Sequence, residues 1–106
     1  MPEDALGLLE TTSLVSMVVA CDAMLKTAQV RLVSVERIGC AVLTASIRGD
    51  VAAVRAALDA GSAAAARLGR PAVVTLLAAP APELSGRFPV GPGPRKSEGD
   101  EFVCVC

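Results

Sequence analysis

The chain has 106 residues, a formal net charge of −1 and no histidine, and 53% of its residues are hydrophobic although only 2% are aromatic. This length predicts a single domain, and the near-neutral charge gives no support for nucleic-acid binding. The lack of histidine, tyrosine and paired carboxylates argues against an enzyme. No apolar run approaches the roughly 20 residues of a membrane span, and the start MPEDALG does not resemble a signal peptide. We therefore expect a cytoplasmic protein whose four cysteines stay reduced.

The first half of the chain predicts a strand, a helix and two further strands. Residues 4–10 form an apolar strand, and the hydroxyls of residues 11–13 can cap a helix that begins at Leu14. Apolar residues then recur at helical spacing as far as Ala28, with Cys21 on the buried face. Residues 30–36 and 40–48 read as two strands joined by a turn at Gly39.

The second half predicts another helix, a last strand and a tail. Asp50 is a good N-cap, and a stripe of mostly small apolar residues continues to Leu68. Gly69 is placed to end the helix in a left-handed conformation, and residues 72–79 form the last strand. We assign residues 1–81 to the domain and residues 82–106, rich in proline, glycine and charge, to a tail that is partly disordered or docks elsewhere. The element order is that of an α+β, ferredoxin-like βαββαβ fold, a four-stranded antiparallel sheet with two helices on one face.

Two stretches, DALGLLET and CDAMLKTAQVRLVSVERIGCAVLTASIRGDVAAVRAALDAG, carry a family resemblance over roughly residues 4–80. Together they resemble the hexameric shell proteins of bacterial microcompartments (BMCs). The resemblance implies a structural subunit of the shell, in the bacterial cytoplasm, that forms a homohexamer with a central pore for small solutes. Its implied partners are other copies of itself, other shell proteins and, indirectly, the enclosed enzymes, with no nucleic acid or membrane.

The resemblance also implies roles for particular residues. The turn of Arg37, Ile38, Gly39, Cys40 and Ala41 would line the pore. Lys26 would lie at the hexamer edge and pack against its symmetry mate in the neighbouring hexamer. The family's usual Arg-Pro-His near the last strand is replaced here by Ala79, Pro80 and Ala81, which removes a contact between hexamers.

Cys40 stands where the family usually has serine. The Gly-Cys turn is similar to that of shell proteins from glycyl-radical-type compartments, which implies an iron–sulfur cluster as a cofactor, held by six converging Cys40 thiols and serving electron transfer. A plain pore with no metal is the alternative. Cys21 is expected in the core. For Cys104 and Cys106 three interpretations stand side by side: an exposed terminus, a second metal-binding or redox pair, and a strand that docks onto a neighbouring chain.

A small ferredoxin-like regulatory protein that binds a ligand is the leading alternative to a shell subunit. No glycine-rich loop for phosphate supports it. Such a regulator would usually be a dimer or trimer, so native mass separates it from a hexamer.

Overall fold

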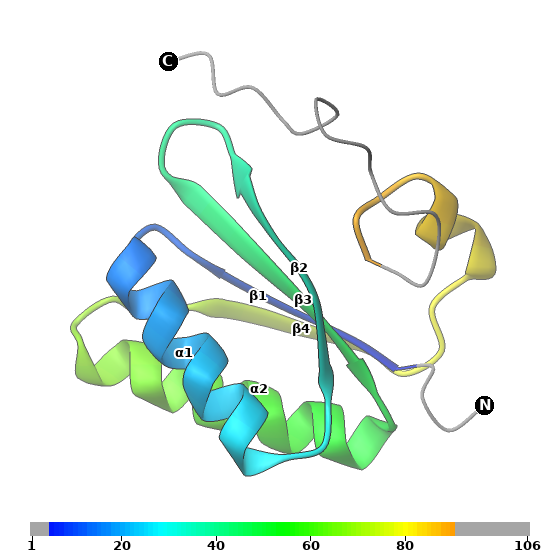
Figure 1. The fold of residues 1–106 in the computed structure, drawn as a ribbon, viewed down its shortest axis with the longest axis horizontal. Coiled ribbons are helices and arrows are strands. Elements are labelled where there is room, and N and C mark those ends of the chain that lie inside the picture. Colours follow the sequence, from blue (N-terminus) through cyan, green and yellow to red (C-terminus); the bar gives the residue numbers. More distant parts are fainter. Residues whose placement is uncertain (1–4, 91–106) are drawn as a thin grey trace.

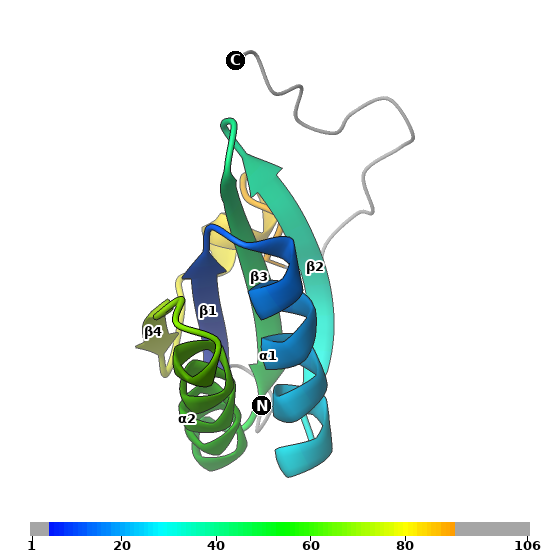
Figure 2. The same ribbon diagram turned by 90° about the vertical axis from the view of Figure 1, so that its left-hand side faces the viewer.

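The computed structural model of the protein describes residues 5–90. The elements are β1 (Ala5–Thr11), α1 (Leu14–Thr27), β2 (Arg31–Ile38), β3 (Val42–Gly49), α2 (Val51–Arg67), β4 (Val73–Leu77) and the 3₁₀ helix η1 (Pro82–Gly86). The strands form one antiparallel sheet in the order β2-β3-β1-β4. Both α-helices cover the same face of this sheet, as Figures 1 and 2 show. The predicted βαββαβ order and fold class are confirmed.

Local signals fix the starts of both helices and the end of α2, as predicted. The Ser13 hydroxyl accepts a hydrogen bond from the Ser16 N–H at the start of α1, over 3.3 Å. The Asp50 carboxylate accepts one from the Ala53 N–H at the start of α2, over 2.8 Å. Gly69 follows α2 with φ +76°, a left-handed conformation that glycine adopts at little cost.

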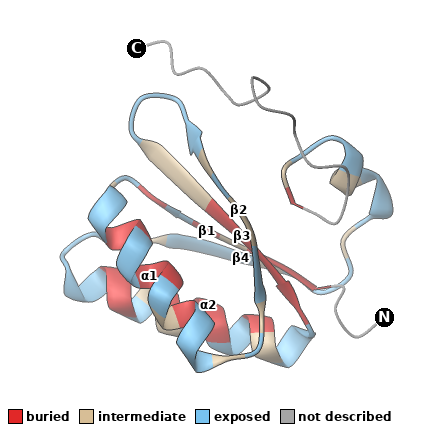
Figure 3. Ribbon diagram, viewed as in Figure 1, coloured by how far each residue is buried: buried red, intermediate tan, exposed pale blue. Residues whose placement is uncertain are grey.

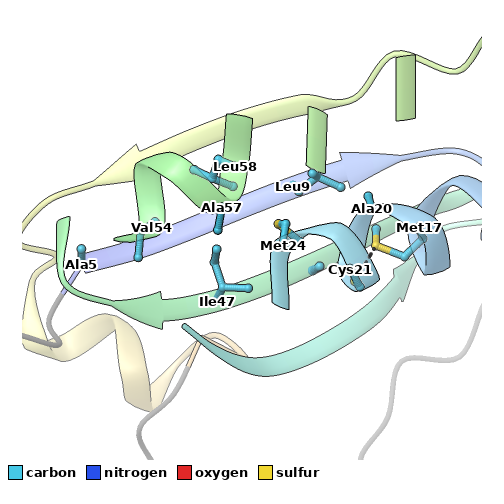
Figure 4. Close-up of a cluster of buried hydrophobic side chains, with 11 residues drawn as sticks. Ala5, Leu9, Met17, Ala20, Cys21, Met24, Ile47, Val54, Ala57 and Leu58 are labelled. Atoms are coloured by element: carbon cyan, nitrogen blue, oxygen red, sulfur yellow. Dashed lines mark hydrogen bonds between the residues drawn. The ribbon is translucent and has the colours of Figure 1, made fainter. Parts of the chain in front are cut away.

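The core lies between the helices and the sheet (Figures 3 and 4). It contains no ring, so aliphatic, methionine and cysteine side chains fill it, among them Leu9, Met17, Met24, Ile47, Val54 and Leu58. Glycine lets the layers approach closely, because a Cβ on Gly7 would come within 2.7 Å of Val54 Cγ1. Cys21 is buried in this cluster, as predicted, and its thiol donates to Met17 Sδ over 3.6 Å.

The hairpin between β2 and β3 differs from the prediction by two residues. The prediction placed Cys40 in a strand, but Ile38 pairs with Val42, so Gly39, Cys40 and Ala41 form a three-residue turn. Gly39 has φ +73°, the left-handed conformation that such loops commonly require. Cys40 therefore lies in the turn itself.

Residues 82–90, which we call the strap, belong to the predicted tail but pack against the sheet. The strap begins with η1, and Figure 2 shows it on the side of the sheet away from the helices. Arg48 Nε donates to the Val90 carbonyl over 2.9 Å, and Ser34 Oγ donates to the Pro89 carbonyl over 2.6 Å. The rest of the predicted tail, with Cys104 and Cys106, lies outside the described residues.

Candidate functional site

The β2–β3 turn is the first candidate site. In Figures 1 and 2 it projects beyond the helical layer at one end of the molecule. All five predicted pore residues, Arg37, Ile38, Gly39, Cys40 and Ala41, are exposed in the single chain. The turn therefore presents a guanidinium group, a branched apolar side chain, a flexible glycine and a sulfur atom on one small protrusion.

The two cysteines in the described part of the chain differ in state. Cys40 is disulfide-bonded, whereas Cys21 is a buried thiol. Burial raises the pKa of the Cys21 thiol, because desolvation disfavours the thiolate. The expectation that every cysteine stays reduced is wrong for Cys40, since disulfide pairing depends on which sulfur atoms the fold brings together.

A metal site needs more ligands than this turn carries in one chain. Within residues 5–90 no three His, Cys, Asp or Glu side chains come together as a metal-binding group. An iron–sulfur cluster commonly takes four thiolates. As far as residues 5–90 are concerned, Cys40 could thus serve one only together with copies from other chains.

The predicted edge residues lie far from the turn. Lys26 is exposed in the last turn of α1 and pairs with Asp22 over 3.1 Å. This end of α1 and the β2–β3 turn lie at opposite ends of the molecule in Figures 1 and 2. Ala79 and Ala81 are exposed in the segment that joins β4 to η1.

Large apolar side chains are exposed on α1 and on both edge strands. They include Leu14, Val15 and Val18 on α1, Leu32 and Val35 on β2, and Val73 and Val74 on β4. The outer edges of β2 and β4 have no pairing strand within the described residues. Exposed apolar surface and open edges of this kind mark contacts with other proteins.

A groove on the open face of the sheet was missed by sequence reasoning. It has a volume of about 320 Å³ and an apolar lining that includes Leu6, Leu8, Ile38, Leu77, Phe88 and Val90. The strap forms one of its walls and is anchored by Arg48, which is only 4% exposed. A charged residue at the end of an apolar strand was the one available signal, because a buried arginine needs hydrogen-bond partners.

Comparison with known proteins decides the family. The family model described as the BMC domain matches residues 5–82. The chain belongs to the BMC domain family. It is 49% identical over 88 residues to the bacterial microcompartment shell protein EutM of Escherichia coli K12, covering 83% of this chain and 91% of EutM. It is 43% identical over 91 residues to the shell protein PduA of Salmonella typhimurium, covering 86% of this chain and 97% of PduA.

A solved structure agrees with this assignment. A microcompartment protein from Desulfitobacterium hafniense superimposes with a TM-score of 0.67 at 33% identity. The match covers 76% of this chain but 43% of that one, so this BMC protein spans less than half of its structural neighbour.

The predicted family and role are confirmed by these relatives. The protein is a structural subunit of a bacterial microcompartment shell and not an enzyme. The relatives favour this role over the alternative of a ligand-binding regulator. Within residues 5–90, no helix is both long and apolar enough to cross a membrane.

Proposed function

We propose that this BMC protein forms a homohexamer in which six β2–β3 turns surround a central pore for small solutes. The observation that carries the proposal is the exposed turn of residues 37–41, which projects beyond the helices in a chain of this family. Six copies of Arg37 would form a positive ring, which raises the local concentration of anionic solutes. Gly39 supplies the left-handed backbone that the turn needs.

The exposed apolar surfaces support self-assembly. A small chain with large apolar residues exposed on α1, β2 and β4 gains stability when copies cover them. Lys26, Ala79 and Ala81 are the proposed hexamer edge. Alanine at 79 and 81 cannot make a charged contact, so this subunit would tile weakly alone and assemble with other shell proteins.

Native mass spectrometry tests the hexamer directly. The expected mass is six times the chain mass of 10.7 kDa, while a dimer or trimer would contradict the proposal. Arg37→Gln should leave this mass unchanged and lower the flux of an anionic solute through reconstituted shells, with Arg67→Gln in α2 as the matched control. Equal loss of flux in both variants would refute the positive ring.

The edge assignment has its own test. Ala79→Arg should promote sheets of hexamers visible by electron microscopy, because it restores a charged donor at the edge. Lys26→Ala should abolish those sheets while leaving the hexamer mass intact. Sheets of equal extent with and without Lys26 would exclude it from the edge.

An iron–sulfur cluster at the pore is a second proposal, supported by the position of Cys40 at the exposed turn tip. It requires Cys40 in its thiolate form, so the protein is first reduced and then reconstituted anaerobically with iron and sulfide. Visible charge-transfer absorption should appear in the wild type and be lost in Cys40→Ser. Identical spectra for the two proteins would exclude the cluster.

A further inference from the structure

The open face of the sheet holds a groove that shares only Ile38 with the proposed pore turn and contains none of the proposed edge residues. The groove described above has an apolar lining, and its volume of about 320 Å³ is at the low end for a binding pocket. It therefore suits a short peptide segment or two apolar side chains. On its floor, Thr44 Oγ1 is buried without a hydrogen-bond partner in the structure of residues 5–90. An incoming peptide group could satisfy that hydroxyl.

The chain leaves the described region at the wall of this groove. Val90 is only 7% exposed, lines the groove, and is held through its carbonyl by Arg48. The 16 residues that follow end in the sequence EFVCVC. Those residues therefore start beside an apolar groove and finish in a hexapeptide that is apolar except for Glu101.

The disulfide of Cys40 points to the same hexapeptide. Cys21 is a buried thiol, so the remaining cysteines of the chain are Cys104 and Cys106. Cys40 is two residues from Ile38, which lines the groove. A chain segment that lies in the groove is thus close to the sulfur atom with which its own cysteine would pair.

The length of chain permits this arrangement. The 14 residues from Val90 to Cys104 can span about 46 Å when extended, which exceeds the 37 Å longest dimension of the protein. In an extended segment, Phe102, Cys104 and Cys106 project to one side. The aromatic ring and a cysteine can therefore face the sheet together.

We propose that the groove is the docking site for the C-terminal segment of the same chain, residues 101–106, and that a disulfide from Cys40 to Cys104 or Cys106 locks it there. In the oxidised state the segment is fixed against the sheet beside the β2–β3 turn. In the reduced state it is held by apolar contacts alone. Within the hexamer, six such segments would lie near the pore, and this consequence alone rests on the proposed function.

The locking step is a thiol–disulfide exchange. A low-molecular-weight disulfide such as oxidised glutathione is the oxidant. The thiolate of one cysteine attacks it and releases one small thiol, and the second cysteine then attacks the mixed disulfide and releases another. The protein loses two protons and two electrons, which the two small thiols carry away.

Peptide mapping of the full-length protein tests the pairing. After treatment with oxidised glutathione and trypsin, we expect a linked pair of peptides 38–48 and 97–106, which reductant separates. Mixing nitrogen-15-labelled and unlabelled protein before oxidation should give no hybrid pair, because the bond is within one chain. A bond between Cys104 and Cys106, a Cys40–Cys40 bond or a hybrid pair would overturn the proposal.

A variant outside the folded domain tests docking separately from pairing. Phe102→Asp should slow formation of the Cys40 disulfide by about tenfold or more, because it removes a large apolar side chain from the groove. Ser97→Asp, with a new charge outside the hexapeptide, should leave the rate unchanged. Equal rates for Phe102→Asp and wild type would refute docking, even if the disulfide forms. Native mass is measured on the same samples, so failure of the hexamer is seen independently.

Discussion

Replacing Gly61 with a larger residue should weaken the packing of α2 against the rest of the core. A Cβ at this position would come within 2.7 Å of Met24 Cγ and 3.0 Å of Leu9 Cδ1, and both of those side chains are fully buried. Overpacking of this kind costs about 1–3 kcal/mol, and alanine regains about 1 kcal/mol of helix propensity over glycine. We expect Gly61→Ala to lower the free energy of unfolding by roughly 1 kcal/mol and Gly61→Val by roughly 3 kcal/mol, since valine is larger and β-branched.

Urea unfolding followed by far-ultraviolet circular dichroism measures these changes. Protein concentration is held constant because self-association adds to apparent stability. Ala63→Gly, at an exposed position of the same helix, measures the difference in helix propensity between alanine and glycine without a change in core packing. Met24→Ala should partly rescue Gly61→Val by making room for the new side chain. If Gly61→Ala instead stabilised the protein by the full difference in helix propensity, the predicted cost of the close contact with Met24 and Leu9 would be refuted.

Three further changes test the strap, a helix cap and the buried thiol. Arg48→Met should lower the free energy of unfolding by about 2 kcal/mol and increase hydrogen exchange at residues 84–90, because the Val90 carbonyl loses a charged donor; Arg55→Met, at an exposed site on α2, should do neither. Asp50→Ala should cost about 1 kcal/mol by removing the cap of α2, whereas Asp50→Asn should retain most of it; equal costs would rule out the cap. Because burial raises the pKa of Cys21, the unfolded chain releases this proton first. Stability should then fall as pH rises above about 8.5, towards the folded pKa, and Cys21→Ala should remove that part of the decline; an identical decline in both proteins would assign it to other groups.

Features fixed by neighbours in sequence were predictable. Ser13 and Asp50 begin their helices, and Gly69 ends the second helix, because capping groups act within a few residues. The apolar periods placed Cys21 on the buried face for the same local reason. Gly39 marked the turn, but the cross-strand register of β2 and β3 sets which residues flank it.

Features set by distant contacts were not predictable. The composition of residues 82–90 suggested an irregular tail, yet the strap packs on the sheet because Arg48 donates to a carbonyl 42 positions later. The groove exists only because the strap stands beside β1, β2 and β3, so no single segment encodes it. The disulfide state of Cys40 was also not predictable, since a disulfide requires a second sulfur atom and sequence spacing does not show which one lies nearby.

The two proposed uses of Cys40 exclude each other within any one chain. An iron–sulfur cluster needs its sulfur as a thiolate, whereas the C-terminal lock needs the same sulfur in a disulfide. Anaerobic, reducing conditions favour the cluster, and low-molecular-weight disulfides favour the lock. In a protein with serine at both Cys104 and Cys106, oxidised glutathione leaves Cys40 as a mixed disulfide, because no second cysteine displaces the glutathione. A low concentration of reduced glutathione should therefore restore iron uptake in this protein more readily than in the wild type, whose second cysteine re-forms the lock. Under excess reductant the two proteins should take up iron equally, because the C-terminal cysteines then do not compete for Cys40.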